Sequence, residues 1–247
     1  MKVSIITIVF NNRETIADAI ESVLSQTYPD IEYIVVDGLS TDGTVDEVRK
    51  YGTRISKFVS EKDKGLYDAI NKGIKLATGE IIGFLHSDDI FFNANAVASV
   101  AAAFEVHQTD SIYADLLYVQ KADTGKVVRN WVSGSYNREN FMYGWMPPHP
   151  TFYVKKSCYD QYGLYNTGFR SAADYELMLR FLFKHHISTT YIPETLIKMR
   201  IGGKSNVTLK NRIRANREDY AAWLVNELQP RFYTRYLKPL RKLVQYL

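Results

Sequence analysis

The feature that most limits the possible folds of this chain is an alternation of strand-like and helix-like segments in its N-terminal part. Val3 to Phe10 and Ile31 to Val36 are short runs rich in β-branched residues, and apolar residues recur at helical spacing between them. The alternation continues through segments near 45–50, 57–59, 69–77 and 81–85. Because consecutive βαβ units place parallel strands side by side, the pattern predicts a mainly parallel sheet with helices on both faces.

The pattern changes after a helix expected near Ala94 to His107. Strands are expected at 111–119, 126–132 and 151–154, followed by a helix at about 174–184, which predicts a smaller antiparallel sheet added to the first. The chain has 247 residues, enough for one large α/β domain. We expect a main domain over residues 1–205, with halves 1–104 and 105–205, and a helical extension over residues 206–247.

Polar residues follow each of the four expected parallel strands. In sheets of this kind, ligands bind beyond the carboxyl ends of the strands. The four strand exits are therefore expected to converge on one cleft, and they carry Asn11, Asn12, Asp37, Gly38, Ser60, Glu61, His86, Ser87, Asp88 and Asp89.

Asp88 and Asp89 place two carboxylates at the end of an apolar strand. Hard oxygen ligands in such a position suit Mg²⁺ or Mn²⁺, which bind one or two carboxylates and complete their shells with water and substrate phosphates. The alternative is a helix cap or an Asx turn, which is the commoner reason for such a pair. The polar strand exits around the pair favour the metal site.

Asp37 precedes a turn of small polar residues, and a carboxylate there can accept hydrogen bonds from a base or a ribose, or simply form the turn. No G-x-G-x-x-G motif follows a strand, which argues against a nicotinamide dehydrogenase. A glycine-rich segment at 202–205 lacks the earlier glycine of a P-loop, because Lys198 stands at that position. A P-loop ATPase is therefore not expected.

The order and spacing of several segments resemble the inverting glycosyltransferases of family 2, which have the GT-A fold. The resemblance runs from Val3 to about Ser205. Its segments are the opening Ser4 to Thr7 with Asn11, then Val36 and Asp37 with the turn Ser40 to Thr44, the block Lys64 to Gly73, and the stretch from Ala77 through Phe84 to Asp89.

The resemblance implies a nucleotide-sugar-binding half over residues 1–104 and an acceptor-binding half over residues 105–205. It implies that the donor is a nucleotide-diphosphate sugar and that Asp88, with Asp89, holds the metal. The residues expected to bind the nucleotide sugar are Val9, Asn11, Asp37, Asp68, Asn71, Ser87 and Asp88. The chain departs from the family at His86, where an aspartate that contacts the ribose usually begins the D-x-D motif.

Asp174 begins a predicted helix, where the helix dipole would favour its anionic form. In the family, the matching acidic residue is the base that deprotonates the acceptor hydroxyl, so we expect Asp174 to be catalytic. The alternative is a helix cap.

Two further groups are assigned by resemblance. His149 matches an acceptor-loop histidine, and Trp145 could stack on an acceptor sugar, although aromatic residues in such loops more often serve packing. Gly203, Lys204 and Ser205 resemble a glycine-rich lid over the diphosphate, with a surface turn as the alternative.

Charge is distributed unevenly, because the last fifth of the chain is rich in Lys and Arg and has only Glu218, Asp219 and Glu227 as acidic residues. The segment Arg231 to Leu247 interleaves basic and apolar residues, which is typical of a helix on an anionic membrane face. Packing on its own domain or in a homodimer are the alternatives, and nothing beyond charge suggests nucleic acid.

The compartment expected from the sequence is the cytoplasm, with peripheral contact at the inner face of the membrane as one reading of the basic tail. The initial apolar run lacks a cleavage site, and the single cysteine, Cys158, allows no internal disulfide.

Three classes of function fit these features. A glycosyltransferase would use a metal-bound nucleotide sugar and a sugar or lipid-linked oligosaccharide acceptor. A sugar-phosphate nucleotidyltransferase would need a basic, glycine-rich loop after the first strand, and none is present. A non-catalytic nucleotide-sugar-binding protein would have no use for Asp174. The sequence therefore favours the transferase.

Overall fold

A computed structural model of the chain describes residues 1–202, 209–234 and 237. The strands in these residues are β1 (Val3–Val9), β2 (Ile31–Asp37), β3 (Lys57–Ser60), β4 (Ile81–Phe84), β5 (Ile90–Phe91), β6 (Ser111–Val119), β7 (Val127–Trp131), β8 (Tyr153–Lys155) and β9 (Thr189–Arg200). The α-helices are α1 (Ile16–Leu24), α2 (Thr44–Arg49), α3 (Leu66–Leu76), α4 (Ala96–His107), α5 (Lys156–Tyr162), α6 (Ala173–Met178) and α7 (Leu209–Val225). Short 3₁₀ helices lie at Gly52–Arg54, Arg138–Tyr143 and His149–Thr151, and a π-helix at Leu179–Lys184 continues α6.

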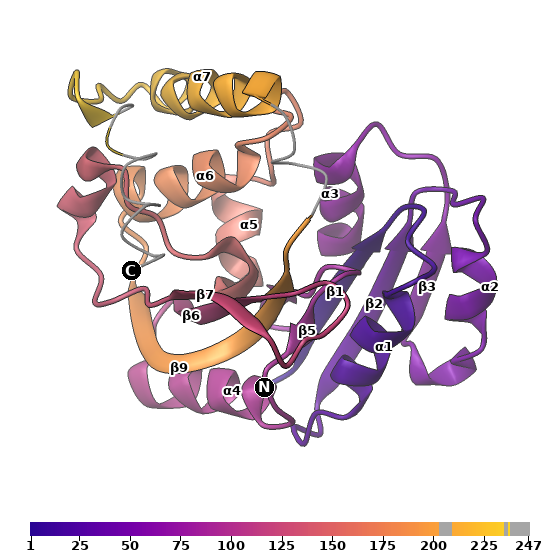
Figure 1. Cartoon of the computed structure of the whole chain (residues 1–247). Coiled ribbons are helices and arrows are strands. Elements are labelled where there is room, and N and C mark those ends of the chain that lie inside the picture. Colours follow the sequence, from indigo (N-terminus) through magenta and orange to yellow (C-terminus); the bar gives the residue numbers. More distant parts are fainter. Residues whose placement is uncertain (203–208, 235–236, 238–247) are drawn as a thin grey trace.

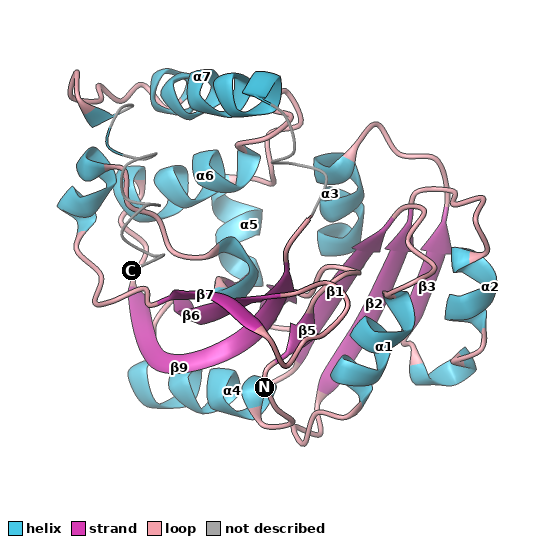
Figure 2. Ribbon diagram, viewed as in Figure 1, coloured by secondary structure: helices cyan, strands magenta, loops and turns pink. Residues whose placement is uncertain are grey.

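All the described strands belong to one sheet (Figure 2), in the order β3-β2-β1-β4-β8-β6-β9-β5, with β7 added beside β6. The strands β3, β2, β1 and β4 are mutually parallel, and β8 pairs antiparallel with both β4 and β6. β9 runs parallel to β6 and antiparallel to β5. The parallel first half thus places the carboxyl ends of four strands at one edge of the sheet.

The hydrophobic core has two layers, one on each face of the sheet. In β1, Ile6 and Ile8 face a layer formed with α3, α5, α6 and α7, whereas Val3, Ile5 and Val9 face a layer formed with α1, α2 and α4. Successive side chains of a strand point to opposite faces, so a strand that is apolar throughout becomes buried on both sides.

The predicted fold class is confirmed, with differences in the second half. The predicted antiparallel strands extend the same sheet instead of forming a separate one. The strand expected at 151–154 is divided between a 3₁₀ helix and β8, and the helix expected at 174–184 becomes α6 and the π-helix. β9 and α5 were not predicted.

α7 lies alongside α6 (Figure 1, yellow above salmon), and its Trp223 and Ala222 are buried in the core layer beneath it. Of the predicted basic tail, residues 235–236 and 238–247 lie outside the described residues. No helix in the described parts of the chain has the length and apolar character needed to cross a bilayer.

Candidate functional site

The first two strand exits form one hydrogen-bonded unit. Asp37 is fully buried, and its carboxylate accepts hydrogen bonds from the Ser40 amide at 3.0 Å, from the Ser60 hydroxyl at 2.6 Å and from the Ser40 hydroxyl. Asn11 adopts a left-handed backbone conformation, with φ of 48°, and its Oδ1 accepts from the Thr41 amide at 2.8 Å. Val9 pairs with Asp37 in the β1–β2 ladder. The structure therefore brings Val9, Asn11 and Asp37 together at the exits of β1 and β2.

The turn after β4 is tied to the loop after β1. The Asn12 amide group donates to the Ser87 hydroxyl at 3.0 Å, and the Thr15 hydroxyl donates to the Ser87 carbonyl at 2.9 Å. These bonds bring the Ser87–Asp88 turn to the same edge of the sheet as Asn11.

Asp88 and Asp89 occupy different environments. Asp88 is partly exposed, and burial raises its pKa although Arg200 and Lys121 attract its negative charge. Asp89 is only 1% exposed, and its Oδ1 accepts a hydrogen bond from the Arg200 amide at 3.1 Å. Burial and the neighbouring carboxylate of Asp88 raise the pKa of Asp89 well above its ordinary value. The two carboxylates therefore do not form an equivalent pair.

Arg200, the last residue of β9, holds this turn in place. Its guanidinium donates to the Asp88 carbonyl at 2.9 Å and binds the Asp18 carboxylate of α1. No sequence pattern indicated this role, because Arg200 lies in a strand that was not predicted.

Asp68 and Asn71, on α3, both form hydrogen bonds with backbone groups. The Asp68 carboxylate accepts from the Lys64 amide at 2.9 Å, before the start of the helix. Asn71 is 9% exposed; its amide nitrogen donates to the Tyr165 carbonyl at 2.8 Å, and its Oδ1 accepts from the Tyr165 amide at 2.9 Å. These two bonds connect α3 to the loop before α6.

Asp174 is the second residue of α6 and is contacted from both sides. The Tyr67 hydroxyl donates to its Oδ1 at 3.4 Å, and His149 Nδ1 lies 3.5 Å from its Oδ2. Tyr67 comes from α3 and stacks on Tyr165. The sequence missed Tyr67 as a partner of Asp174, although it lies in the block Lys64 to Gly73 that carries the resemblance.

His149 connects Asp174 to the turn that holds Asp88. Its ring lies 5.4 Å from the ring of His86, centroid to centroid. Burial lowers the pKa of His149, although the nearby charges of Asp174 and Asp88 partly oppose the shift. Burial, with a smaller contribution from His149, lowers the pKa of His86 to about 3. Two neutral imidazoles therefore lie between the Ser87–Asp88 turn and Asp174 at neutral pH.

Trp145 is packed in the core and does not present its ring to an acceptor. It is 8% exposed, its indole N–H donates to the Ser133 carbonyl at 3.1 Å, and its ring makes edge contacts with Tyr113 and Phe141. The structure thus favours packing over sugar stacking. Gly203, Lys204 and Ser205, the predicted lid, lie outside the described residues.

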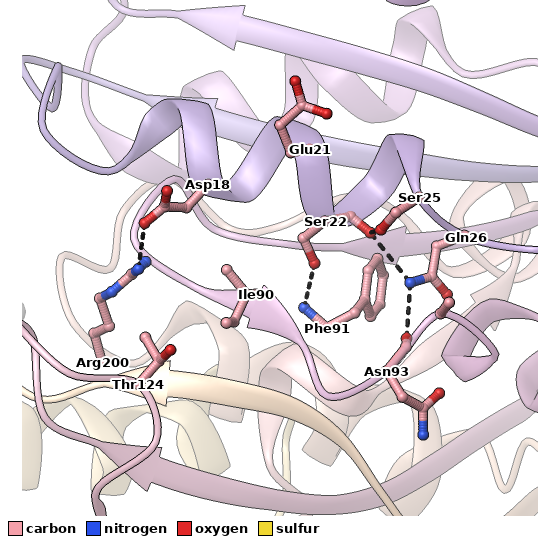
Figure 3. Close-up of a pocket in the computed structure, with 11 residues that line it drawn as sticks. Asp18, Glu21, Ser22, Ser25, Gln26, Ile90, Phe91, Asn93, Thr124 and Arg200 are labelled. Carbon is pink, nitrogen blue, oxygen red and sulfur yellow. Dashed lines mark hydrogen bonds and ion pairs between the residues drawn. The ribbon is translucent and has the colours of Figure 1, made fainter.

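A surface groove of about 540 Å³ runs along α1 and β5, away from Asp174. Figure 3 shows that polar groups along it are already paired with one another: the Phe91 amide donates to the Ser22 hydroxyl, and the Gln26 side chain donates to the Asn93 carbonyl. Arg200 is at one end of the groove, where it binds Asp18. None of the predicted site residues lines this groove, so it is not the candidate site.

The family model and the relatives that this chain resembles indicate the same family. The model of the family described as glycosyl transferase family 2 matches residues 4–172, ending just before Asp174. A PGL/p-HBAD biosynthesis glycosyltransferase of Mycobacterium bovis is 27% identical over 208 residues, which cover 82% of this chain and 78% of that protein.

Solved structures share the fold. The 1–349 fragment of S. aureus TarS, in complex with UDP-GlcNAc, superposes with a TM-score of 0.73 at 20% identity, over 96% of this chain and 70% of that one. The mannosyltransferase PcManGT from Pyrobaculum calidifontis, in complex with GDP-Man and Mn²⁺, gives a TM-score of 0.68 at 17% identity, over 99% and 69%. This chain spans 41% of the longer TarS chain. With the family match over more than half of its length, this chain belongs to glycosyl transferase family 2.

Proposed function

We propose that this glycosyltransferase inverts the configuration of the sugar that it transfers, with Asp174 taking the proton of the acceptor hydroxyl. The observation that carries the proposal is the contact of Asp174 with His149, whose ring also packs against His86 near Asp88. This chain of contacts supports a single site, with Asp174 as the base on one side and the Ser87–Asp88 turn on the other, where we place the donor.

The chemistry follows from a single displacement. The acceptor oxygen attacks the anomeric carbon from the face opposite the diphosphate, and the new C–O bond forms as the bond to the diphosphate oxygen breaks. The hydroxyl proton passes to Asp174 as the bond forms. Tyr67 and His149 each contact one carboxylate oxygen, which orients Asp174 for this role.

The donor side supports a nucleotide-diphosphate sugar. Val9, Asn11, Asp37 and Ser87 lie at or next to the strand exits where ligands bind in parallel sheets. The similar TarS structure holds UDP-GlcNAc and the PcManGT structure holds GDP-Man, which supports the same class of donor here.

Asp88 fits a role as ligand of Mg²⁺ or Mn²⁺, which when bound would neutralise the leaving diphosphate. Burial raises the pKa of Asp88, and a cation beside it would offset the cost of its charge. Asp89 Oδ1 accepts the Arg200 amide and so anchors β9, whereas its buried Oδ2 has no hydrogen-bond partner among the described residues; in this proposal Asp88 binds the cation and Asp89 Oδ2 is the second carboxylate oxygen beside it. The Mn²⁺ in PcManGT supports metal use.

The acceptor that we propose is a sugar or a lipid-linked oligosaccharide, since the M. bovis relative is named for PGL/p-HBAD biosynthesis. Peripheral contact with the inner membrane face would bring the enzyme to such an acceptor. The basic composition of the C-terminal part supports that contact, and dimerisation remains the alternative use of this part.

The test measures release of nucleoside diphosphate from UDP-GlcNAc, UDP-glucose and GDP-mannose in the presence of a lipid-linked oligosaccharide acceptor, with Mn²⁺ or with EDTA. We expect one donor to be turned over only with metal, and Asp174→Asn to lower turnover by about 10²–10⁴-fold, the usual contribution of a general base. Asp174→Asn should still bind the donor in a thermal-shift assay, whereas Asp88→Ala should lose the metal-dependent part of that shift. Asp160→Asn, at an exposed carboxylate on α5, is the matched control.

Other outcomes identify the alternatives. Release of pyrophosphate from a nucleoside triphosphate and a sugar phosphate would indicate a nucleotidyltransferase. Donor binding without turnover, with Asp174→Asn indistinguishable from wild type, would indicate a binding protein. Retention of the anomeric configuration in the product, read by NMR, would contradict the inverting mechanism.

A further inference from the structure

The N-terminus of α6, the helix that carries Asp174, receives no hydrogen bond from the side chain of its own N-cap residue. Ala172 precedes α6 and provides no side-chain hydrogen bond. Instead, one carboxylate oxygen of Glu218, on α7, accepts the amides of Arg170, Ser171 and Ala172 at 3.1, 2.7 and 3.1 Å. Two of these amides precede the helix and the third belongs to its N-cap residue, so Glu218 fixes the turn that leads into α6 through charge-assisted hydrogen bonds, and it does so from a different helix.

Two further bonds, one from α7 and one from Asn226 directly after it, hold α6 on the other side of Asp174. The Trp223 indole N–H donates to the Tyr175 hydroxyl at 3.0 Å, and the Asn226 amide group donates to Glu176 Oε1 at 3.0 Å. Trp223 and Asn226 are 1% and 3% exposed, so these bonds are made in the protein interior. Residues on both sides of Asp174, 170–172 before it and 175–176 after it, are therefore held by α7 and Asn226.

We propose that Glu218 is a positioning residue for Asp174, and that α7 is part of the catalytic apparatus and not a detachable extension. The inference rests on the proposed role of Asp174. It assigns a function to a helix that lies beyond residues 4–172, the part that matches the family model. Figure 1 shows α7 along the outer side of α6, and Glu218 connects it to the turn that leads into Asp174.

The physical reason is geometric. A base must lie within hydrogen-bond reach of the proton that it takes, and a small displacement of a catalytic group lowers the rate steeply. Without Glu218, three amides lose their shared acceptor, and the turn at 170–172 is free to change its course into α6. The partners of Asp174 from other elements, Tyr67 and His149, would then meet a carboxylate whose backbone has moved.

The experiment compares Glu218→Ala with Glu218→Gln in the full chain, using the donor that the wild type turns over with Mn²⁺. We expect Glu218→Ala to lower kcat by about tenfold or more with the KM for the donor almost unchanged, because the donor side does not touch Glu218. Glu218→Gln keeps an oxygen that can accept the same amides and should recover most of kcat. Hydrogen exchange at residues 170–176 should accelerate in the alanine variant alone.

Two controls separate positioning from loss of stability. Val100→Ala opens a cavity under α4 in the opposite core layer, and it should lower the melting temperature while keeping kcat at an assay temperature below unfolding. Glu227→Ala removes an exposed carboxylate that pairs with Lys184 and should change neither quantity.

The proposal is overturned if Glu218→Ala keeps wild-type kcat, or if its loss of kcat is matched by Val100→Ala at equal loss of stability. Failure of the proposed function has a different signature: the wild type would turn over no donor, or Asp174→Asn would be as active as wild type. The two failures are therefore distinguishable in one set of measurements.

Discussion

Glu32 shows how a single buried carboxylate joins several elements of the parallel half of the sheet. Its oxygens accept hydrogen bonds from the Ser4 hydroxyl on β1, the Lys57 ammonium on β3, and both the amide and the hydroxyl of Thr78 after α3. Burial alone would raise the pKa of Glu32, but these bonds outweigh it and lower the pKa to about 2. The charged form is thus strongly favoured in the fold.

This shift predicts a pH dependence of stability. The pKa of Glu32 is lower in the folded than in the unfolded chain, where it is near 4.5, so its contribution is complete above that value and is lost as the pH falls from 4.5 through about 2. The shift corresponds to a contribution on the order of 3 kcal/mol. Urea unfolding at pH 7 and pH 3 should therefore show Glu32→Gln to be destabilising at pH 7 and much less so at pH 3. Equal losses at both pH values would contradict this assignment.

His149 is expected to act as a neutral hydrogen-bond donor to Asp174. We predict that His149→Asn, whose amide N–H can replace Nδ1–H, keeps more activity than His149→Ala, which should lose about tenfold or more in kcat. Because burial lowers the pKa of His149, an NMR titration of its ring should have a midpoint below the ordinary value of 6.5. A midpoint above 6.5, or equal activities of the two variants, would argue against this role.

At the scale of elements, the packing of β4 against β8 depends on Gly83. A Cβ built at this position would lie 2.0 Å from Cε1 of Tyr153, whose side chain is fully buried on β8. The absence of a side chain on one strand thus makes room for a large ring on its neighbour.

Gly83→Ala is therefore predicted to be strongly destabilising, by about 1–3 kcal/mol or more, because a fully buried ring has little room to move. Gly168→Ala is the matched control, since Gly168 is exposed and the nearest atom to its added Cβ is the end of the Asn166 side chain. Urea denaturation would measure both variants. A Gly83→Ala variant as stable as the control would show that the β4–β8 pair adapts more readily than the geometry indicates.

The elements that could be predicted are those whose signals are local. Ser111–Val119 forms a strand with the predicted bounds, and β1, β2, β3 and β4 differ from their predictions by one residue, because runs of β-branched residues between helical patterns identify buried parallel strands. β9 was missed because it contains Pro193 and charged residues, and its pairing with β6 and β5 connects segments that are far apart in the sequence.

The candidate site residues also divide into those with a local sequence signal and those defined by long-range contacts. The positions of Asn11, Asp37 and Ser87 follow from their places after strands, so their convergence could be predicted. The roles of Arg200, Tyr67 and Glu218 depend on tertiary contacts with Asp88 or with α6, and no local pattern indicates them. Trp145 lies in a loop in the sequence but in the core of the fold, because the surrounding aromatic rings enclose it.

At the scale of the whole molecule, the two expected halves are parts of one sheet. β8 joins the parallel strands to β6, and β9 extends from the far side of β6 to Arg200, which binds Asp88 and Asp18 in the first half. Both core layers continue from one half into the other.

This continuity predicts that donor binding leaves the shape of the enzyme unchanged. Small-angle scattering with and without the active donor and Mn²⁺ should give the same radius of gyration, because hinge closure needs a few connecting residues that can absorb large changes in φ and ψ. A clear contraction on binding would contradict the prediction and indicate that the ladder between β4 and β8 bends.

Arg200 also limits how these segments can change in evolution. Its guanidinium binds both the backbone carbonyl of Asp88 and the carboxylate of Asp18. It therefore links three segments, namely β9, the turn after β4 and α1. Changes in any one of them would disturb the other two, so relatives that alter donor preference are expected to exchange the three segments together.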